Sequence, residues 1–399
     1  MSKSKGKRNN IVSSDTNVRM AISCEPLYKK GGAENHLKHI IHTFPNCELF
    51  TAYYDEQFVK EYFPNVKINH SFMQYLPWKN KLRYVYIVFE PLAYRLFKFK
   101  NFDVVVSLSI AFSRFVEPKN IKHINLCMSP PKFLWQKDDR TVKNINQLNG
   151  VNRLFYNIYE SFLGRMLENR WRKLDVKSAK RCTKIIANSN VVKERIKRIY
   201  NLESDVIYPP VEVSEIQSFG EVNRKENWFL YMGRVERYKG VKLAIEACAK
   251  LGYPLKIAGT GDDLEAMKEL VRNLNARGLI KFLGFVSESE KLELLSKAKA
   301  LIFPVRGEDF GIVPVEANAA GTPVVAYRDG GVLETISEHN PKTGVFFDEY
   351  NVKSLMKVLK KFRSEDYNQD SCKKQAQNFA SEIFEYKFRN YVLDVLSAN

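Results

Sequence analysis

The chain has few cysteines and no long apolar segment. Its six cysteines lie far apart, at Cys24, Cys47, Cys127, Cys182, Cys248 and Cys372. No two of them have the close spacing of a zinc or redox site, so we expect reduced and mostly buried thiols. No apolar run is long enough to cross a bilayer, and the start MSKSKGKRNN lacks the apolar core of a signal peptide. We therefore expect a cytoplasmic protein.

Positive charge is concentrated in the first half of the chain. Residues 1–210 hold 36 Lys and Arg against 18 Asp and Glu, whereas residues 211–399 hold 27 of each. A field of this sign attracts anions such as nucleic acid, an anionic membrane surface or a phosphorylated acceptor. The same excess also fits a surface that is merely well solvated, and both interpretations stay open.

Short β-branched runs alternate with longer helical patterns along the whole chain. The predicted strands span 18–23, 47–52, 66–71, 104–108, 123–127, 184–187, 205–208, 228–232, 255–258, 280–283, 300–304, 323–326 and 345–347. Predicted helices between them include 241–250, 264–273, 288–298 and 312–320. This alternation predicts an α/β protein with two doubly wound, Rossmann-like parallel sheets.

The order of these elements also suggests domain boundaries. We expect a disordered basic tail over 1–17, a first domain over 18–211 with a helical insertion at about 140–180, a second domain over 212–380, and a C-terminal helix over 381–399 that packs back on the first domain.

Two predicted helical stretches are rich in aromatic and basic residues. One is residues 82–99, and the other is the region 151–200, which carries 13 Lys and Arg against 4 Asp and Glu. Such helices can lie in a membrane interface, which would make the protein peripheral on the cytosolic face. Packing on a sheet is the commoner arrangement, and we favour it.

Glycine-rich turns follow two predicted strands, at the edge where open parallel sheets bind ligands. Gly31 and Gly32 open a helix, so backbone N–H groups there could approach a phosphate closely. Gly259 and Gly261 follow the strand 255–258 and could admit a base or ribose. Taken alone, both are also common turns of α/β folds.

Two basic residues follow the strand 228–232 within one turn segment. Arg234 comes directly after Gly233, and Lys239 follows five residues later. Both can reach one diphosphate, Arg as a planar fork and Lys as a point charge. They would stabilise charge that builds on a leaving diphosphate. The alternative is a pair of surface bases near a turn.

The segment 306–316 is the most informative. It leaves a strand, turns through Gly307 and enters a helix at about Ile312, with Glu308 before the helix and Glu316 inside it. The backbone N–H groups of Phe310, Gly311 and Ile312 would point at a bound anion. Alternatively, Glu308 or Asp309 caps the helix and Glu316 is solvated.

These segments resemble a known enzyme family. GRVERYKG (233–240), AGTGDD (258–263), FLGFVSESE (282–290) and EDFGIVPVEANAAGTPVVAYRDGGVLETI (308–336) look like the retaining glycosyltransferases of family four, which have the GT-B fold. Glu308 and Glu316 match that family's E-x7-E motif. GGAE (31–34), PPKFLW (130–135), IIANSNVVKERI (185–196) and VIYPPV (206–211) resemble the branch of bacterial O-antigen mannosyltransferases.

The resemblance implies a role for each matching residue. Arg234 and Lys239 would bind the donor diphosphate, Glu308 would contact the donor sugar, and these three are the predicted catalytic residues. Glu316 would bind the ribose, and Gly32 would face the diphosphate from the first domain. The full set of predicted donor-binding residues is Gly31, Gly32, Gly233, Gly259, Gly261, Asp309, Phe310, Gly311, Ile312 and Glu316.

The resemblance also implies the reaction. We expect a retaining transferase that moves a hexose from a nucleotide sugar to a glycan or lipid-linked glycan, with GDP-mannose slightly favoured over UDP-sugars. No cofactor and no metal are expected, and the chain has no D-x-D triplet of the kind that holds metal in the other major glycosyltransferase fold. The alternatives are a basic nucleic-acid-binding protein, which lacks a matching signature here, and an inactive sugar-binding GT-B relative.

Two positions depart from the branch. Met128 stands where a His is usual, and a thioether cannot orient a sugar by a strong hydrogen bond or by charge. Asn35 follows GGAE where Arg is common. For this reason the sequence predicts no catalytic base in the first half.

Overall fold

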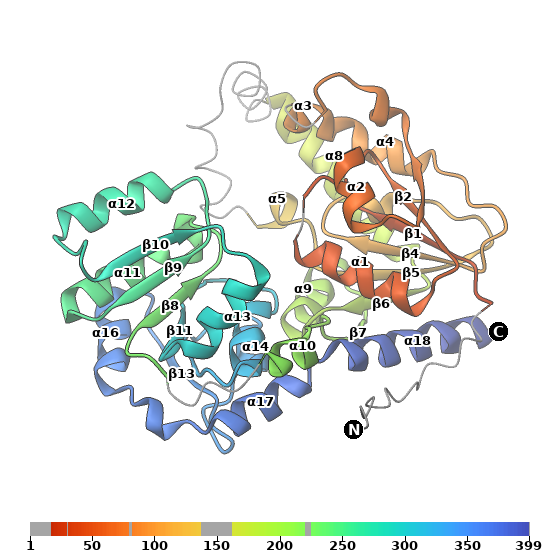
Figure 1. The fold of residues 1–399 in the computed structure, drawn as a ribbon. Helices are drawn as coiled ribbons and strands as arrows, with labels where there is room; N and C mark the ends of the chain where they lie inside the picture. Colours follow the sequence, from red (N-terminus) through yellow and green to blue (C-terminus); the bar gives the residue numbers. More distant parts are fainter. Residues whose placement is uncertain (1–16, 30, 80–81, 137–161, 220–224, 399) are drawn as a thin grey trace, which may run out of the picture.

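The computed structural model describes residues 17–29, 31–79, 82–136, 162–219 and 225–398. The predicted tail over 1–17 and residues 140–161 of the predicted insertion therefore lie almost wholly outside the described residues. The described chain forms two α/β domains, each built on one parallel sheet with helices on its faces (Figure 1). Among the described helices, none is both long and apolar enough to cross a bilayer.

The first sheet has the strand order β3-β2-β1-β4-β5-β6-β7, and every neighbouring pair is parallel. Its strands are β1 (Met20–Cys24), β2 (Cys47–Thr51), β3 (Lys67–His70), β4 (Val104–Ser109), β5 (Lys122–Cys127), β6 (Lys184–Ala187) and β7 (Asp205–Val206). β1 and β4 are buried along their whole length. Apolar runs without polar alternation fold this way because helices cover both faces of the sheet.

The second sheet has the order β10-β9-β8-β11-β12-β13 and is also parallel throughout. Its strands are β8 (Phe229–Met232), β9 (Leu255–Ala258), β10 (Ile280–Gly284), β11 (Ala300–Phe303), β12 (Val324–Tyr327) and β13 (Gly344–Phe347). Each predicted strand is present, with its ends within about two residues of the prediction. The prediction of two doubly wound sheets is confirmed.

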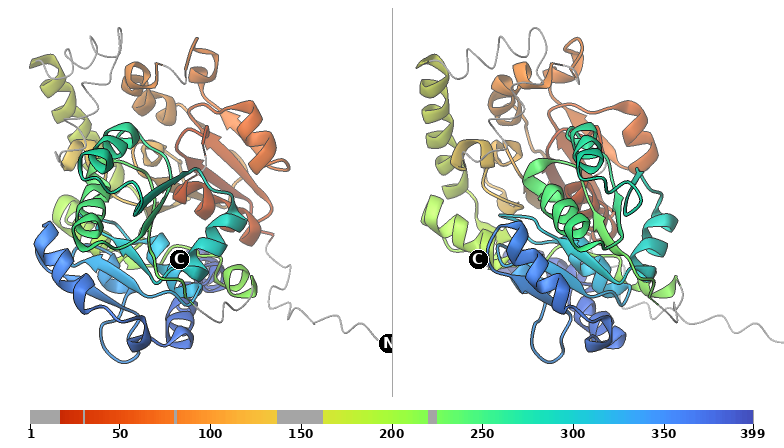
Figure 2. Two further views of the ribbon diagram at one scale, coloured as in Figure 1. Left: turned by 60° about the vertical axis from the view of Figure 1, so that its left-hand side comes forward. Right: turned by 90° about the vertical axis from the view of Figure 1, so that its left-hand side faces the viewer.

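Helices connect the strands and cover the sheets (Figure 2). They are α1 (Gly32–Thr43), α2 (Glu56–Tyr62), α3 (Arg83–Tyr86), α4 (Glu90–Arg95), α5 (Lys132–Trp135), α8 (Phe162–Lys180), α9 (Asn190–Tyr200), α10 (Val213–Ser218), α11 (Val241–Leu251), α12 (Leu264–Asn273), α13 (Glu288–Lys297), α14 (Ile312–Ala319), α15 (Val332–Thr335), α16 (Val352–Lys361), α17 (Gln369–Gln377) and α18 (Ser381–Ser397). The 3₁₀ turns are η1 (Phe72–Tyr75), η2 (Ile87–Phe89), η3 (Ser113–Phe115), η4 (Arg237–Lys239) and η5 (Ser364–Asp366).

The prediction of one continuous helix over 82–99 is wrong. The chain instead forms α3, the 3₁₀ turn η2 and then α4, which has Pro91 in its first turn. Proline lacks the N–H that would continue an α-helix from the preceding turn, and it is well tolerated where a new helix begins. The aromatic and basic region 151–200 likewise divides, because β6 separates α8 from α9.

The chain crosses between the domains twice, and the two crossings are paired. The Val211 N–H donates to the Phe379 carbonyl at 3.1 Å, and the Ser381 N–H donates to the Val211 carbonyl at 2.9 Å. After the second crossing, α18 runs along the first domain (Figure 1). Its Phe388 is buried edge-on against Phe44, the C-cap residue of α1, with ring centroids 6.0 Å apart. The C-terminal helix thus belongs to the core of the first domain.

Candidate functional site

Two helix amino ends, one from each domain, face each other. Gly31 is the N-cap of α1 and Gly311, with φ 95°, is the N-cap of α14, and neither helix has a side-chain cap. A Cβ atom on Gly32 would lie 3.4 Å from Ile312 Cδ1, so the first turns of both helices are adjacent. Helix amino ends carry partial positive charge and unpaired N–H groups. The α14 end can attract an anion, whereas at the α1 end the backbone of Gly31 hydrogen-bonds to the Glu34 carboxyl group.

The three predicted catalytic residues lie together in the second domain. Lys239 Nζ donates to Glu308 Oε2 at 2.9 Å, and about a fifth of each side chain is exposed. Both cations lie near the Tyr238 ring, whose centroid is 5.7 Å from the Arg234 guanidinium and 5.6 Å from Lys239 Nζ. Arg234 also donates to the Tyr238 hydroxyl and to Glu236. Sequence reasoning missed Tyr238, although it stands inside the GRVERYKG segment.

Close packing explains the glycines of the neighbouring turns. A Cβ atom on Gly259, which has φ 135°, would lie 2.0 Å from the Gly233 carbonyl oxygen, and one on Gly261 would lie 2.5 Å from that of Val235. The loops after β8 and β9 can approach each other only without side chains at these positions. The predicted contact of these glycines with a donor stays a prediction.

Glu316 has a cation partner of its own. From α14 it accepts a hydrogen bond from Lys291 Nζ of α13 at 3.0 Å, and Lys291 also pairs with Glu288 at 2.6 Å. Burial alone would lower the pKa of Lys291, but the charge and hydrogen bonds of these two carboxylates raise it. Each glutamate of the E-x7-E pair therefore pairs with a lysine, and no local pattern around Lys291 predicts its role.

Asp309 and Phe310 point away from Glu308. The Asp309 carboxylate accepts from Arg195 at 2.6 Å and pairs with Lys132 at 2.7 Å, and both cations belong to the first domain. Phe310 is buried, with its ring centroid 5.6 Å from that of Tyr208 and 5.4 Å from that of Phe379. The prediction that Asp309 and the backbone of Phe310 bind the donor stays a prediction, and these contacts are what their side chains make in the structure.

The first domain adds carboxyl groups that the sequence reasoning missed. Glu25, at the end of β1, accepts hydrogen bonds from the backbone N–H groups of Ile110 and Ala111 at 3.1 and 2.8 Å. Burial, together with the charge of Glu25, raises the pKa of Glu90 well above its usual value. Burial also raises the pKa of Glu34, in the first turn of α1. A lone glutamate after a strand is too common a pattern to predict such a group.

The two departures from the branch pattern have structural partners. Met128 packs on the core of the first domain, and its N–H donates to the Ser109 carbonyl at 2.9 Å. The Asn35 amide donates to the Pro210 carbonyl at 3.1 Å, which ties α1 to the first crossing. Met128 thus contributes to the core of the first domain, and Asn35 to the attachment of the first crossing.

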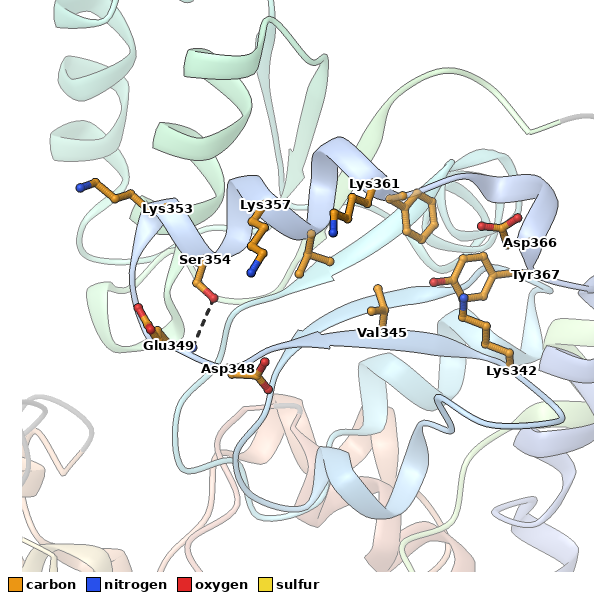
Figure 3. Close-up of a pocket in the computed structure, with 12 residues that line it drawn as sticks. Lys342, Val345, Asp348, Glu349, Lys353, Ser354, Lys357, Lys361, Asp366 and Tyr367 are labelled. Carbon is orange, nitrogen blue, oxygen red and sulfur yellow. Dashed lines mark hydrogen bonds between the residues drawn. The ribbon is translucent and has the colours of Figure 1, made fainter.

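Two surface hollows lie in the second domain. One, of about 490 Å³, lies between α16 and β13, where Lys357 and Lys361 reach over it and Lys342 and Tyr367 close one end (Figure 3). The other, of about 580 Å³, lies between α11 and α12. Neither is lined by the predicted catalytic residues, whose proximity rests on their direct contacts. Among the described residues, no three His, Cys, Asp or Glu side chains are grouped so as to hold a metal ion.

Comparison with known sequences identifies a family match within the second domain and relatives of longer parts of the chain. Residues 213–379 match the family described as Glycosyl transferases group 1. The O-antigen chain mannosyltransferase RfbU of Salmonella typhimurium is 36% identical over 154 residues, which cover 37% of this chain and 43% of RfbU. The alpha-1,3/1,6-mannosyltransferase ALG2 of Dictyostelium discoideum is 22% identical over 82% of this chain and 80% of its own. The match to RfbU has the higher identity of the two, and it spans less than half of the length of RfbU.

Comparison with solved structures identifies the fold. HepE from Anabaena, solved in complex with UDP, superposes with a TM-score of 0.66 over 94% of this chain and 100% of its own, at 17% identity. Together with the two facing parallel-sheet domains, this likeness shows that the fold is GT-B.

Proposed function

We propose that the protein is a glycosyltransferase that moves a hexose from a nucleotide sugar to a glycan or lipid-linked glycan. One observation carries the proposal: Arg234, Lys239 and Glu308 lie together, with Lys239 bonded to Glu308 and both cations next to the Tyr238 ring. The Glycosyl transferases group 1 match includes all three residues. Relatives that are named mannosyltransferases support the same reaction class.

In the proposed reaction, breaking the bond between sugar and phosphate leaves negative charge on the nucleoside diphosphate. Arg234, Lys239 and the α14 amino end would stabilise this charge more strongly in the transition state than in the bound donor. Glu308 now holds Lys239 through one hydrogen bond. When the diphosphate takes over Lys239, the Glu308 carboxylate would become free to accept from sugar hydroxyls.

The finer points of the proposal rest on resemblance. Retention of anomeric configuration and independence of metal follow from the likeness of the segment 308–336 to family four. Mannose is slightly favoured because RfbU and ALG2 are named mannosyltransferases. A UDP-sugar is the next choice, since HepE was solved with UDP. The excess of basic residues in the first half favours an anionic acceptor, such as a lipid-linked diphosphate glycan at a membrane surface.

A donor panel tests this proposal. The purified chain is incubated with GDP-mannose and with several UDP-sugars, and the free nucleotide released is measured. Thermal shifts with GDP, UDP and ADP report binding separately. We expect release from one donor and stabilisation by its nucleotide. No shift with any nucleotide and no release would contradict the proposal, and steeply salt-dependent binding to DNA or RNA would favour the nucleic-acid alternative. A nucleotide shift without turnover would favour an inactive relative.

A further inference from the structure

We infer that Asp309 is an interdomain latch that positions the Glu308 loop when the two domains are in contact, an inference that rests on the proposed function. The carboxylate uses both oxygens on the first domain: Oδ1 accepts from Arg195 at 2.6 Å, and Oδ2 pairs with Lys132 Nζ at 2.7 Å. Asp309 is 21% exposed and Arg195 only 7%. These charged groups are largely buried, and a buried ion pair is screened less by salt than an exposed one.

The latch is anchored on both sides of the domain contact. Arg195 also donates to Ser129 Oγ at 2.8 Å, which fixes the guanidinium within the first domain. The Ser189 hydroxyl donates to the Asp309 backbone carbonyl at 2.6 Å, so backbone and side chain are both held. The cations come from PPKFLW and IIANSNVVKERI, two segments far from Asp309 in the sequence. The Asp309 carboxylate thus joins its own loop to two separate segments of the first domain.

Three consecutive residues of the loop have three different partners. Glu308 holds Lys239 within the second domain, Asp309 holds the first domain, and Phe310 packs between the two crossings. The loop itself has little freedom. The Gly331 N–H donates to the Glu308 carbonyl at 2.8 Å, and a Cβ atom on Gly330 would lie 2.4 Å from that same oxygen. Displacement of the first domain is therefore passed through Asp309 to its neighbour Glu308.

A second contact between the domains provides a matched control. Glu334 of α15 accepts from the N–H groups of Asn190 and Val191 at 2.9 and 3.2 Å, at the amino end of α9. It also accepts from the Tyr208 hydroxyl at 3.0 Å. Like Asp309 it joins the domains through a carboxylate, but it lies outside the loop that carries Glu308. Loss of the Glu334 charge should weaken the contact between the domains but leave the Asp309 contacts of the Glu308 loop in place.

The test compares Asp309→Asn with Glu334→Gln, two changes that keep side-chain shape and remove one charge. For Asp309→Asn we expect kcat to fall on the order of tenfold to a hundredfold, as for a small displacement of a reacting group. The Kd values of GDP and UDP should stay close to wild type, because Arg234 and Lys239 lie in the second domain. Lys132→Met should act in the same direction, and its effect should not add to that of Asp309→Asn. Asp309→Glu should restore part of the rate.

Hydrogen exchange of the backbone N–H groups in 306–316 gives a readout that needs no turnover. Asp309→Asn should speed this exchange severalfold, and Glu334→Gln should not. Unchanged exchange in Asp309→Asn, equal effects of both variants, or a nucleotide Kd weakened as much as kcat would each overturn the latch. If the wild-type chain turns over no donor, the proposed function fails, while the exchange result still decides whether Asp309 positions the loop.

Discussion

The free energy of unfolding should depend on pH through His39, which lies next to the first crossing between the domains. This side chain of α1 is only 7% exposed, and each ring nitrogen meets a carboxylate: Nδ1 lies 2.7 Å from Glu385 of α18, and Nε2 lies 3.1 Å from Glu212 of the first crossing. His42 also contacts Glu385, and Lys38 also contacts Glu212. Because carboxylates only accept, both nitrogens of His39 must donate, which requires the imidazolium.

The magnitude follows from the pKa shift. Burial alone would lower the pKa of His39, but the hydrogen bonds and charges of Glu212 and Glu385 raise it to about 8 from 6.5. The folded-state value exceeds the unfolded one, so the stabilisation is complete below pH 6.5 and is lost as the pH rises through 8. At about 1.4 kcal/mol per pKa unit, this shift stabilises the folded state by roughly 2 kcal/mol. Somewhat more than half of that stabilisation is lost between pH 7 and pH 9.

Urea unfolding at pH 7 and pH 9 checks this prediction in the wild type and in His39→Gln. The wild type should lose about 1 kcal/mol more than the variant over that interval. Buried thiols such as Cys24 also change stability near pH 9, but they do so equally in both proteins and cancel in the difference. An identical pH dependence of the two proteins would show that His39 is not a protonated partner of Glu212 and Glu385.

Two further variants test the site. Lys239→Ala should reduce transition-state stabilisation by about 2–4 kcal/mol, by analogy with removing one preorganised donor to a developing anion. The control is Lys242→Ala, which removes an exposed side chain that pairs with Glu246 and should keep the wild-type kcat/KM. Equal kinetics of the two variants would refute the role of Lys239 in stabilising the transition state. Gly259→Ala should lower the melting temperature markedly because its Cβ would lie 2.0 Å from the Gly233 oxygen, whereas Gly278→Ala, with open space around its Cβ, should not; similar melting of the two would contradict the packing argument.

The sequence predicts the sheets well because parallel strands leave a local signature. β4 begins with three consecutive valines, and the turn before α14 contains the glycine that its backbone requires. The helix over 82–99 was mispredicted because its composition outweighed the single proline that divides it. Local pattern thus succeeds where one segment determines its own structure.

Contacts between distant segments could not be predicted in this way. Lys132 and Arg195 lie far from Asp309 along the chain, and nothing in their neighbours marks them as its partners. Lys291 stands beside a recognised segment, but only the fold brings it to Glu316. Pairing of charges across domains depends on topology, which side-chain spacing does not record.

The rate of nucleotide release by Glu308→Ala, measured with the donor that the wild type prefers, shows whether Glu308 belongs to the reaction site. We expect turnover to collapse while the melting temperature and the Kd of the free nucleotide stay near wild type. A rate equal to that of the wild type would mean that the reaction takes place elsewhere, and that the contact between Glu308 and Lys239 serves only the fold.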